Sequence, residues 1–344
     1  MAKKKSFLGL DVGTRCVKAV ELSMRKGQPV VTGLGFCEYS GTDIESRKKA
    51  IRDAIATIKT KPCAVGVSGR SVCVRYIPVT AANLEELKGA IAFEADKYIP
   101  FEVADVYMDG QNITPFSDTG EAKELKALLV AVKKDVVENA AKDAIDTGLT
   151  PWVVDVEAFA LGNALVAQRV SGEATGATDV PMGAVSALVD VGAFKTTVNI
   201  VKNGISHFSR EVYVGGNDFA QALVDRVGVD EDGAQTLLRE GGEKAEEAAH
   251  IVATVMEEMS GEVKLAIDYY ENQFAEEVQE VMVCGGASLA RPILDQLTIH
   301  LEKTVSRWDP FRGFVVEGAD TDALGPRRVQ FAIALGLAAR LMES

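Results

Sequence analysis

The sequence of 344 residues lacks the features that mark several protein classes. Its five cysteines form no CxxC pair and are odd in number, which argues against a disulfide framework or a zinc site and favours reduced thiols. It has no excess of basic residues: the formal net charge of −13 argues against a general binder of nucleic acid. No apolar run reaches the roughly 20 residues of a membrane span, and the N-terminus lacks the apolar core of a signal peptide. We therefore expect a cytosolic protein.

Two short stretches place a carboxylate at the end of an apolar strand. Residues 9–22 read GLDVGTRCVKAVEL, with the acid at Asp11, and residues 187–201 read ALVDVGAFKTTVNIV, with the acid at Asp190. The second acid lies 179 positions after the first (190 − 11), which is about half the chain. Each turn alone fits an ordinary β-turn, because Asp and Gly are turn residues. The pair indicates a duplicated architecture whose halves face a shared ligand.

These turns have the chemistry to bind phosphate. Backbone N–H groups in a glycine turn approach an anion closely, and an acid beside them can hold a hydrated Mg²⁺. A third site, at 281–288 (VMVCGGAS), is a buried strand that ends in two glycines, where a base and ribose could rest. The candidate cofactor-binding residues are Asp11, Gly13, Thr14, Lys18, Asp190, Gly192, Thr196, Thr197, Gly215, Gly216, Gly285 and Gly286. Of these, Asp11 and Asp190 are the candidate metal residues, acting through water.

The hydrophobic pattern predicts an α/β protein. The expected strands are a hairpin over 7–22 and single strands over 30–38, 64–67, 71–77, 125–132 and 152–156, followed by a second hairpin from 187, an Asn203-Gly204 turn with a strand through 214, and a strand at 281–284. The expected helices are 45–59, 83–100, 135–147, 157–170, 217 onward, 230–239, 243–274 and 331–342. Residues 171–182 are rich in Gly, Thr, Ser and Asp, which favours a flexible crossing between lobes.

The order of these motifs resembles the actin-like ATPase superfamily. The resemblance rests on DVGT with Lys18, VVDVEAFAL at 153–161, DVGAFKTT, VCGGAS and the apolar helix FAIALGLA. The insertion after the first α/β block resembles the FtsA branch. Within that branch, NLEELKGAIAFEADKYIPF is similar to the corresponding segment of the PilM family of type IV pilus assembly proteins.

This resemblance implies a two-lobed actin-like ATPase (ribonuclease H-like) fold with an inserted subdomain of the FtsA/PilM 1C type. It implies subdomain 1A over 1–78 and 151–185, the 1C-like subdomain over 79–150, a second lobe over 186–325, and a C-terminal helix over 326–344 that packs back on the core. It also implies ATP with Mg²⁺ between the lobes. Glu157 lies where related ATPases orient water and is a candidate catalytic group, although an acid in the first turn of a helix can equally stabilise that helix.

The resemblance further implies a cytosolic adaptor of a pilus or related secretion machine. It would dock the cytoplasmic tail of a PilN-like inner-membrane protein in a groove near the inserted subdomain, contact other pilus components, and reach the membrane through that partner rather than by insertion. Self-association is possible in such a fold. Tyr98, Pro100 and Phe101 are a candidate docking surface, but an aromatic beside Pro at a helix end also fits local core packing.

Two departures from the resemblance predict weak or absent hydrolysis. Ala193, Phe194 and Lys195 fill the second turn where many relatives keep glycine, and Gln235 and Leu238 stand where relatives often carry an acid and a lysine.

Three alternatives stay open. One is an FtsA-like cell-division ATPase, which usually needs an amphipathic membrane helix after the core; the chain ends at Ser344, just after its apolar helix. Another is a sugar or acetate kinase, for which none of the three histidines, His207, His250 and His300, offers a convincing base. The last is an actin-like scaffold without nucleotide.

Overall fold

The computed structural model describes residues 5–40, 43–116, 121–176 and 183–342, and the chain divides into two compact units. We call residues 1–66 with 147–344 the core unit and residues 67–146 the inserted unit. The inserted unit starts at 67 and not at the expected boundary of 79. The reason is that β5 (Val72–Ala81) pairs along its whole length with β7 (Lys123–Lys133). The identity of this unit as a 1C-type subdomain stays a prediction.

The core unit contains two mixed sheets with the same strand order. In the first sheet the order is β14-β3-β2-β1-β4-β8, and in the second it is β11-β10-β9-β12-β13. The shared part is β3-β2-β1-β4 in the first sheet and β11-β10-β9-β12 in the second: three antiparallel strands that follow one another in the chain, and then a strand parallel to the earliest of them. In the first sheet β14 adds a parallel edge strand beside β3. The bounds are β1 Ser6–Val12, β2 Cys16–Arg25, β3 Gln28–Glu38, β4 Pro62–Val67, β8 Thr150–Val156, β9 Ser186–Val191, β10 Thr196–Lys202, β11 Ile205–Val212, β12 Glu280–Cys284, β13 Val305–Arg307 and β14 Val315–Val316. The α/β class and the duplication are confirmed.

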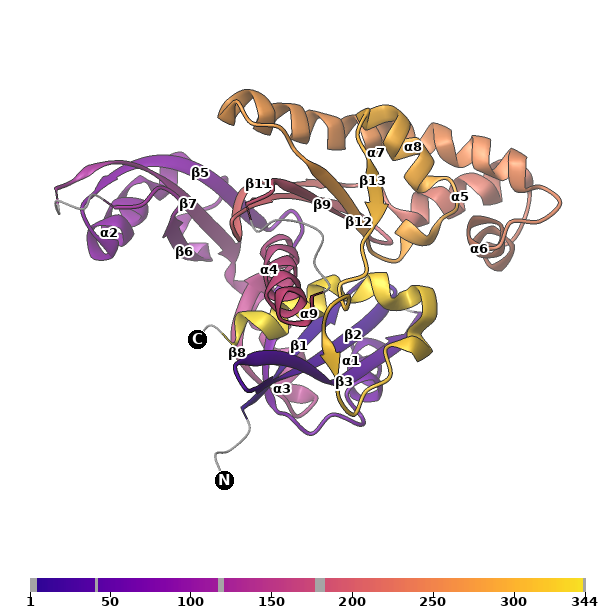
Figure 1. Ribbon diagram of the computed structural model, residues 1–344, viewed down its shortest axis with the longest axis horizontal. Coiled ribbons are helices and arrows are strands. Elements are labelled where there is room, and N and C mark those ends of the chain that lie inside the picture. Colours follow the sequence, from indigo (N-terminus) through magenta and orange to yellow (C-terminus); the bar gives the residue numbers. More distant parts are fainter. Residues whose placement is uncertain (1–4, 41–42, 117–120, 177–182, 343–344) are drawn as a thin grey trace. The chain divides into compact units, whose positions relative to one another are not determined.

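Two helices, α4 (Glu157–Thr175) and α9 (Ala332–Arg340), lie between the two sheets (Figure 1). Helix α9 packs on β1 and β2, whereas α4 packs on α9 and on β10. The expected apolar character of the last helix is confirmed, since eight of its nine residues, Ala332 through Ala339, are buried. Helix α1 (Ile44–Ala54) covers the opposite face of the first sheet, where it contacts β2 and β3.

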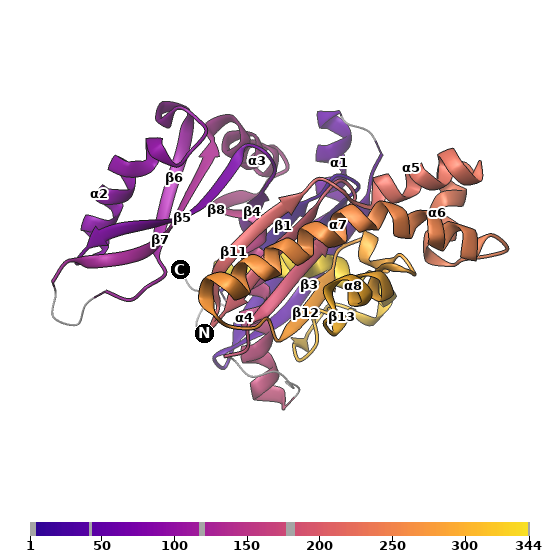
Figure 2. The same cartoon turned by 90° about the horizontal axis from the view of Figure 1, so that it is seen from above.

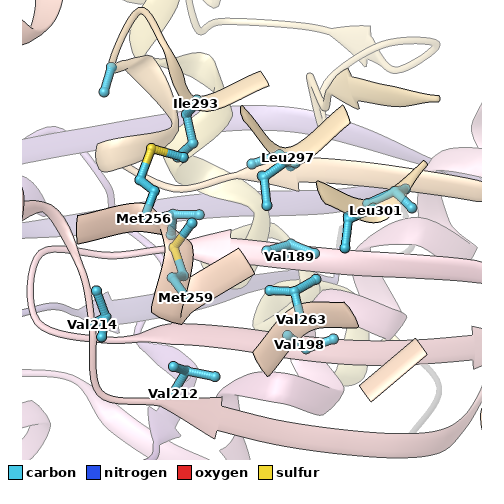
Figure 3. Close-up of a cluster of buried hydrophobic side chains, with 14 of the residues drawn as sticks. Val189, Val198, Val212, Val214, Met256, Met259, Val263, Ile293, Leu297 and Leu301 are labelled. Carbon is cyan, nitrogen blue, oxygen red and sulfur yellow. The ribbon is translucent and has the colours of Figure 1, made fainter. Parts of the chain in front are cut away.

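The outer face of the second sheet is covered by helices. Helix α7 (Ala245–Phe274) lies across β10 and β11, and α5 (Gly216–Val227) and α8 (Ile293–Leu301) pack beside it (Figure 2). Helix α6 (Glu231–Arg239) packs on α5 and α7. One apolar core joins the second sheet to α7 and α8 (Figure 3). It includes Val189, Val198, Val212 and Val214 from the sheet side, Met256, Met259 and Val263 from α7, and Ile293, Leu297 and Leu301 from α8.

The inserted unit is a three-stranded antiparallel sheet, in the order β5-β7-β6, with two helices. Helix α2 (Leu84–Glu94) starts at its predicted cap: Asn83 accepts a hydrogen bond from the Glu86 N–H at 3.0 Å, and the Glu86 carboxylate accepts one from the Ala82 N–H. A 3₁₀ turn over Ala95–Lys97 follows it. A second 3₁₀ turn over Val103–Asp105, strand β6 (Val106–Asn112) and helix α3 (Lys134–Asp146) come later in this unit.

Several predicted boundaries are wrong for local reasons. Helix α4 runs to Thr175, so residues 171–175 are helical and not part of a flexible crossing; Gly176, with φ of 72°, ends the helix. Residues 177–182 of that predicted crossing lie outside the described residues. Helix α1 ends at Ala54 rather than at 59, and β11 ends at Val212 rather than at 214. Strand β6 was not predicted. Among the described residues, no helix has both the length and the apolar character of a membrane span.

Gly336 sets the distance between α9 and α4. A Cβ atom built on Gly336 would lie 1.7 Å from the carbonyl oxygen of Ala160 in α4, so only glycine permits this approach. The contact matters because both helices lie between the two sheets and share one apolar core with them.

We expect Gly336→Ala to lower the free energy of unfolding by more than about 3 kcal/mol, because the helices must separate or shift. The measurement is thermal unfolding followed by circular dichroism. Gly261→Ala in α7 is the matched control: its Cβ would meet nothing within 4 Å, so we expect a gain of roughly 0.5–1 kcal/mol. Equal melting temperatures for the two variants would contradict this account of the α4 and α9 contact.

Candidate nucleotide-binding site

The first acidic turn joins β1 to β2 and contains a buried ion pair. Asp11 is 3% exposed, and its Oδ2 lies 2.8 Å from the Nζ of Lys18, the residue directly opposite it on β2. The Gly13 N–H donates to the Cys16 carbonyl at 3.0 Å and closes the turn. Thr14 is exposed at its tip. The structure thus places the four predicted residues of this turn together.

The second acidic turn joins β9 to β10 with the same geometry. The Gly192 N–H donates to the Lys195 carbonyl at 2.9 Å, three residues on, as Gly13 does in the first turn. Thr197 lies opposite Asp190 on the neighbouring strand, in the place that Lys18 holds opposite Asp11. The two halves of the core unit therefore each carry an aspartate at the corresponding position of a corresponding hairpin.

The two predicted threonines of the second turn have different surroundings. Thr197 is 1% exposed and accepts a hydrogen bond from Lys195 Nζ at 3.5 Å. Thr196 is also buried, but successive side chains of a strand point to opposite faces, and its hydroxyl donates to the Val214 carbonyl at 2.8 Å. Only Thr197 therefore lies on the side of the strand that carries Asp190.

The remaining predicted glycines pack around the second turn. Gly285 follows β12 with φ of 89°, and a Cβ there would lie 2.5 Å from Asp190 Oδ1, so the backbone passes directly over this carboxylate. Gly286 lies next to it, near Gln330. At the start of α5, the Gly216 N–H donates to the Gly192 carbonyl at 2.9 Å, and a Cβ on Gly215 would lie 2.7 Å from the same oxygen. The glycine turns thus form one tightly packed group.

Glu157 begins α4 and is part of a second ion-pair cluster. Its Oε2 lies 3.2 Å from Lys195 Nζ, which also contacts Glu211 Oε1 at 2.5 Å. All three side chains are mostly buried, with 14%, 17% and 22% exposed for Glu157, Lys195 and Glu211. The candidate catalytic carboxylate is therefore bound to a lysine of the second turn.

The charges of the two turns act on one another. Burial raises the pKa of Asp190 to about 6; the negative charges of Asp11 and Glu157 add to this rise, while Lys18 and Lys195 oppose it. Burial alone would lower the pKa of Lys18, but the Asp11 carboxylate outweighs it and raises that pKa. The Cys284 thiol donates to Asp190 Oδ1 at 3.6 Å, and burial beside this acid raises its pKa well above the usual value. These couplings indicate that the charged groups of the two turns lie near one another.

Three functional candidates escaped the sequence analysis. Lys195 was considered only as a bulky replacement for glycine, and Glu211 was not considered. The third, Arg15, leaves the first turn to donate to Asn217 Oδ1 at 3.2 Å and to Glu231 Oε1 at 2.5 Å, which links the first turn to α5 and α6. An exposed arginine in a turn gives no sequence signal for such a distant contact.

Within the described ranges, no group of three or more His, Cys, Asp or Glu side chains is arranged to hold a metal ion. Mg²⁺ is usually bound by one or two carboxylates, waters and the phosphates of a nucleotide. Asp11 and Asp190 supply two such carboxylates beside glycine turns whose backbone could approach phosphate.

Solved structures show the same fold. The chain resembles a structure described as the PilM-PilN type IV pilus biogenesis complex, with a TM-score of 0.82, 23% identity, and 97% of each chain covered. It also resembles MreB5 of Spiroplasma citri bound to ADP, with a TM-score of 0.56, 11% identity, and 98% and 96% covered. These similarities confirm the predicted actin-like fold.

Sequence comparisons identify the family. The cell division protein FtsA of Streptococcus pneumoniae serotype 2 (strain D39 / NCTC 7466) is 28% identical over 246 residues, which are 63% of this chain and 51% of FtsA, so the match spans about half the length of that relative. The family model for the type IV pilus assembly protein PilM matches residues 9–342. With nearly its whole length covered by that model, the chain belongs to the PilM family of type IV pilus assembly proteins.

Proposed function

We propose that this protein is a cytosolic, ATP-binding adaptor of a type IV pilus or related secretion machine. In this role it docks the cytoplasmic tail of a PilN-like inner-membrane protein, which recruits it to the inner face of that membrane. Membership of the PilM family supports the pilus role, and the related structure named as a PilM-PilN complex supports the partner. The observation that carries ATP binding is the pair of matched acidic turns at Asp11 and Asp190.

ATP would lie with its phosphates against the two turns. Asp11 and Asp190 would hold Mg²⁺ through its waters, and Gly285 with Gly286 would support the ribose and base. The bound metal would neutralise the phosphates. MreB5, which has the same fold, has been solved with ADP and with AMPPNP. A role for Gly215 and Gly216 would be indirect, because Gly216 already donates its N–H to the second turn.

The inserted unit offers a groove for the partner. The groove has a volume of about 650 Å³ and follows the end of α2. Its apolar lining includes Ile99, Pro100, Phe101 and Val103, and its charged lining consists of Asp96, Glu102, Asp105 and Lys133. Three acids against one lysine favour a tail that combines apolar anchors with basic residues.

Two of the predicted docking residues have a structural role as well. Tyr98 and Phe101 are partly buried and pack against the core of the inserted unit, as local core residues would. Phe101 also lines the groove, with Lys133 Nζ 5.3 Å from the centre of its ring. Pro100 is exposed in the groove and is the more accessible contact for a partner.

A cell-division role like that of FtsA is the second candidate, because of the sequence similarity to FtsA. FtsA-like proteins attach themselves to membrane, whereas an adaptor needs its partner. Sedimentation with liposomes separates the two: binding of the purified protein alone favours the FtsA-like role, and binding only with a reconstituted PilN-like protein favours the adaptor.

We expect Mg²⁺-dependent ATP binding to weaken as the pH falls through about 6. The Asp190 pKa is raised from 3.8 to about 6, so its carboxylate is ionised above this pH and protonated below it, where it no longer attracts a hydrated cation. Asp190→Asn should lower Mg-ATP affinity at pH 7.5 by at least about tenfold, or 1.4 kcal/mol. Isothermal titration calorimetry of nucleotide-stripped protein, with and without Mg²⁺, measures both effects.

The difference between wild type and Asp190→Asn is the informative quantity, because phosphate groups also titrate near pH 6. Asp225→Asn, an exposed acid on α5, is the matched control and should bind like wild type. Asp11→Ala is a poorer test, since it leaves the buried Lys18 without its acid and destabilises the fold. Failure of the wild type to bind ATP would leave the alternative of a nucleotide-free scaffold.

We expect Glu102→Lys to weaken binding of a PilN-like tail by about tenfold, because it reverses one of the three acids of the groove. Fluorescence anisotropy of a labelled synthetic tail peptide gives the Kd. Glu124→Lys makes the same charge change at an exposed site of β7 in the same unit and should bind like wild type. If both variants lose affinity equally, the groove is not the docking site and only net charge matters.

A further inference from the structure

Lys195 contacts three side chains of the core unit, and the proposed binding of nucleotide gives these contacts no role. Its ammonium lies 3.2 Å from Glu157 Oε2 and 2.5 Å from Glu211 Oε1, and it donates to Thr197 Oγ1 at 3.5 Å. The contacts come from three elements: the start of α4, strand β11 and strand β10. One lysine of the second acidic turn therefore binds the single carboxylate that begins α4.

The surroundings keep this lysine charged. Burial alone would lower its pKa, but Glu157 and Glu211 outweigh burial and raise it. Asp11 and Asp190 also feel its charge: burial raises the pKa of both, and Lys195 opposes that rise. A carboxylate whose charge is balanced by an adjacent ammonium attracts a proton less strongly than an unpaired one. Paired with Lys195, Glu157 is thus a weaker proton acceptor than a carboxylate without such a partner would be.

We propose that Lys195 is a positioning residue that holds Glu157 away from general-base duty, so that bound ATP is retained and not hydrolysed. The inference rests on the proposed function, because it requires ATP bound at the two acidic turns.

In the suppressed reaction, the oxygen of a water would bond to the γ-phosphorus while the bond from that phosphorus to the β-phosphate oxygen breaks. ADP and inorganic phosphate are the products, and the proton of the water passes to a carboxylate. A free Glu157 could accept it; a Glu157 bound to Lys195 does so poorly.

A purely structural reading is that Lys195 only ties α4 to the second hairpin. The two readings differ in what the loss of the lysine does. If Lys195 is only a structural tie, its loss would lower the stability of the fold. The rate of phosphate release would then stay the same or fall. The proposed role predicts a faster release that depends on Glu157.

The test compares wild type with Lys195→Met, Lys195→Arg, Glu157→Gln and the double variant Lys195→Met with Glu157→Gln. Calorimetry gives the Kd for Mg-ATP and Mg-ADP, and single-turnover phosphate release gives the rate with the site saturated. We expect Lys195→Met to raise that rate by about 100-fold, at the lower end of what a general base contributes. The double variant and Lys195→Arg should return to the wild-type rate.

Nucleotide-free protein supplies a second readout. In Lys195→Met the carboxylates of Glu157 and Glu211 face each other without their shared cation, so the melting temperature should fall further below wild type at pH 8 than at pH 5. Adding Glu157→Gln should remove most of that pH dependence. Lys202→Met is the control on the same strand: its ion pair with Glu276, at 2.8 Å, lies at the other end of β10 and should not change phosphate release.

Two results would overturn the inference separately from the proposed function. If Lys195→Met binds Mg-ATP but releases phosphate no faster than wild type, Lys195 does not restrain Glu157, and ATP binding stands. If release is faster but the double variant keeps the increase, Glu157 is not the base. If the wild type binds no ATP, the proposed nucleotide role fails and this inference fails with it.

Discussion

The core unit depends on charge balance where its two acidic turns meet. Four carboxylates lie near one another there, and two ammonium groups pair with them and offset part of their charge. The acids are Asp11, Glu157, Asp190 and Glu211, and the lysines are Lys18 and Lys195. Leaving one partner of a buried ion pair alone costs on the order of 3–5 kcal/mol, so the loss of either lysine would disturb its turn, and the loss of Lys195 also the start of α4.

The fold was largely predictable because its signals are local. Alternating apolar residues and turn residues gave the two hairpins, and Asn203-Gly204 adopts positive φ at both positions, 53° and 78°, as a two-residue hairpin requires. Strand β6 was missed because it contains Asp109 and Gly110 and only Val106 is buried. The end of α4 was misplaced because Ser and Gly at 171 and 172 continue the helix, and the left-handed Gly176 ends it. Composition alone does not show which glycine takes that conformation.

The candidate site was predictable only in part. Asp11 and Asp190 follow from the strand and turn pattern, but Glu211 depends on register. At the tight turn between β10 and β11, Lys202 pairs with Ile205. If this pairing continued without irregularity along both strands, Thr197 would lie opposite residue 210 (202 + 205 − 197). An irregularity between Ile200 and Val201 shifts the pairing by one, and Thr197 faces Glu211 instead. A shift of one residue changes which side chain faces the site, and the sequence carries no visible sign of it.

The same charge count explains why a nucleotide would need a cation here. With all six groups ionised, four negative and two positive charges leave a net charge of −2. A triphosphate brings further negative charge to this space, and repulsion between buried like charges is weakly screened. In the proposed nucleotide complex, Mg²⁺ held through water by Asp11 and Asp190 would reduce that repulsion. Because Lys195 is already bound to Glu157 and Glu211, it could replace the metal only by giving up both of these ion pairs. In the proposed function, this one arrangement of charges would favour retention of nucleotide over proton transfer, as suits an adaptor that is stabilised by its ligand.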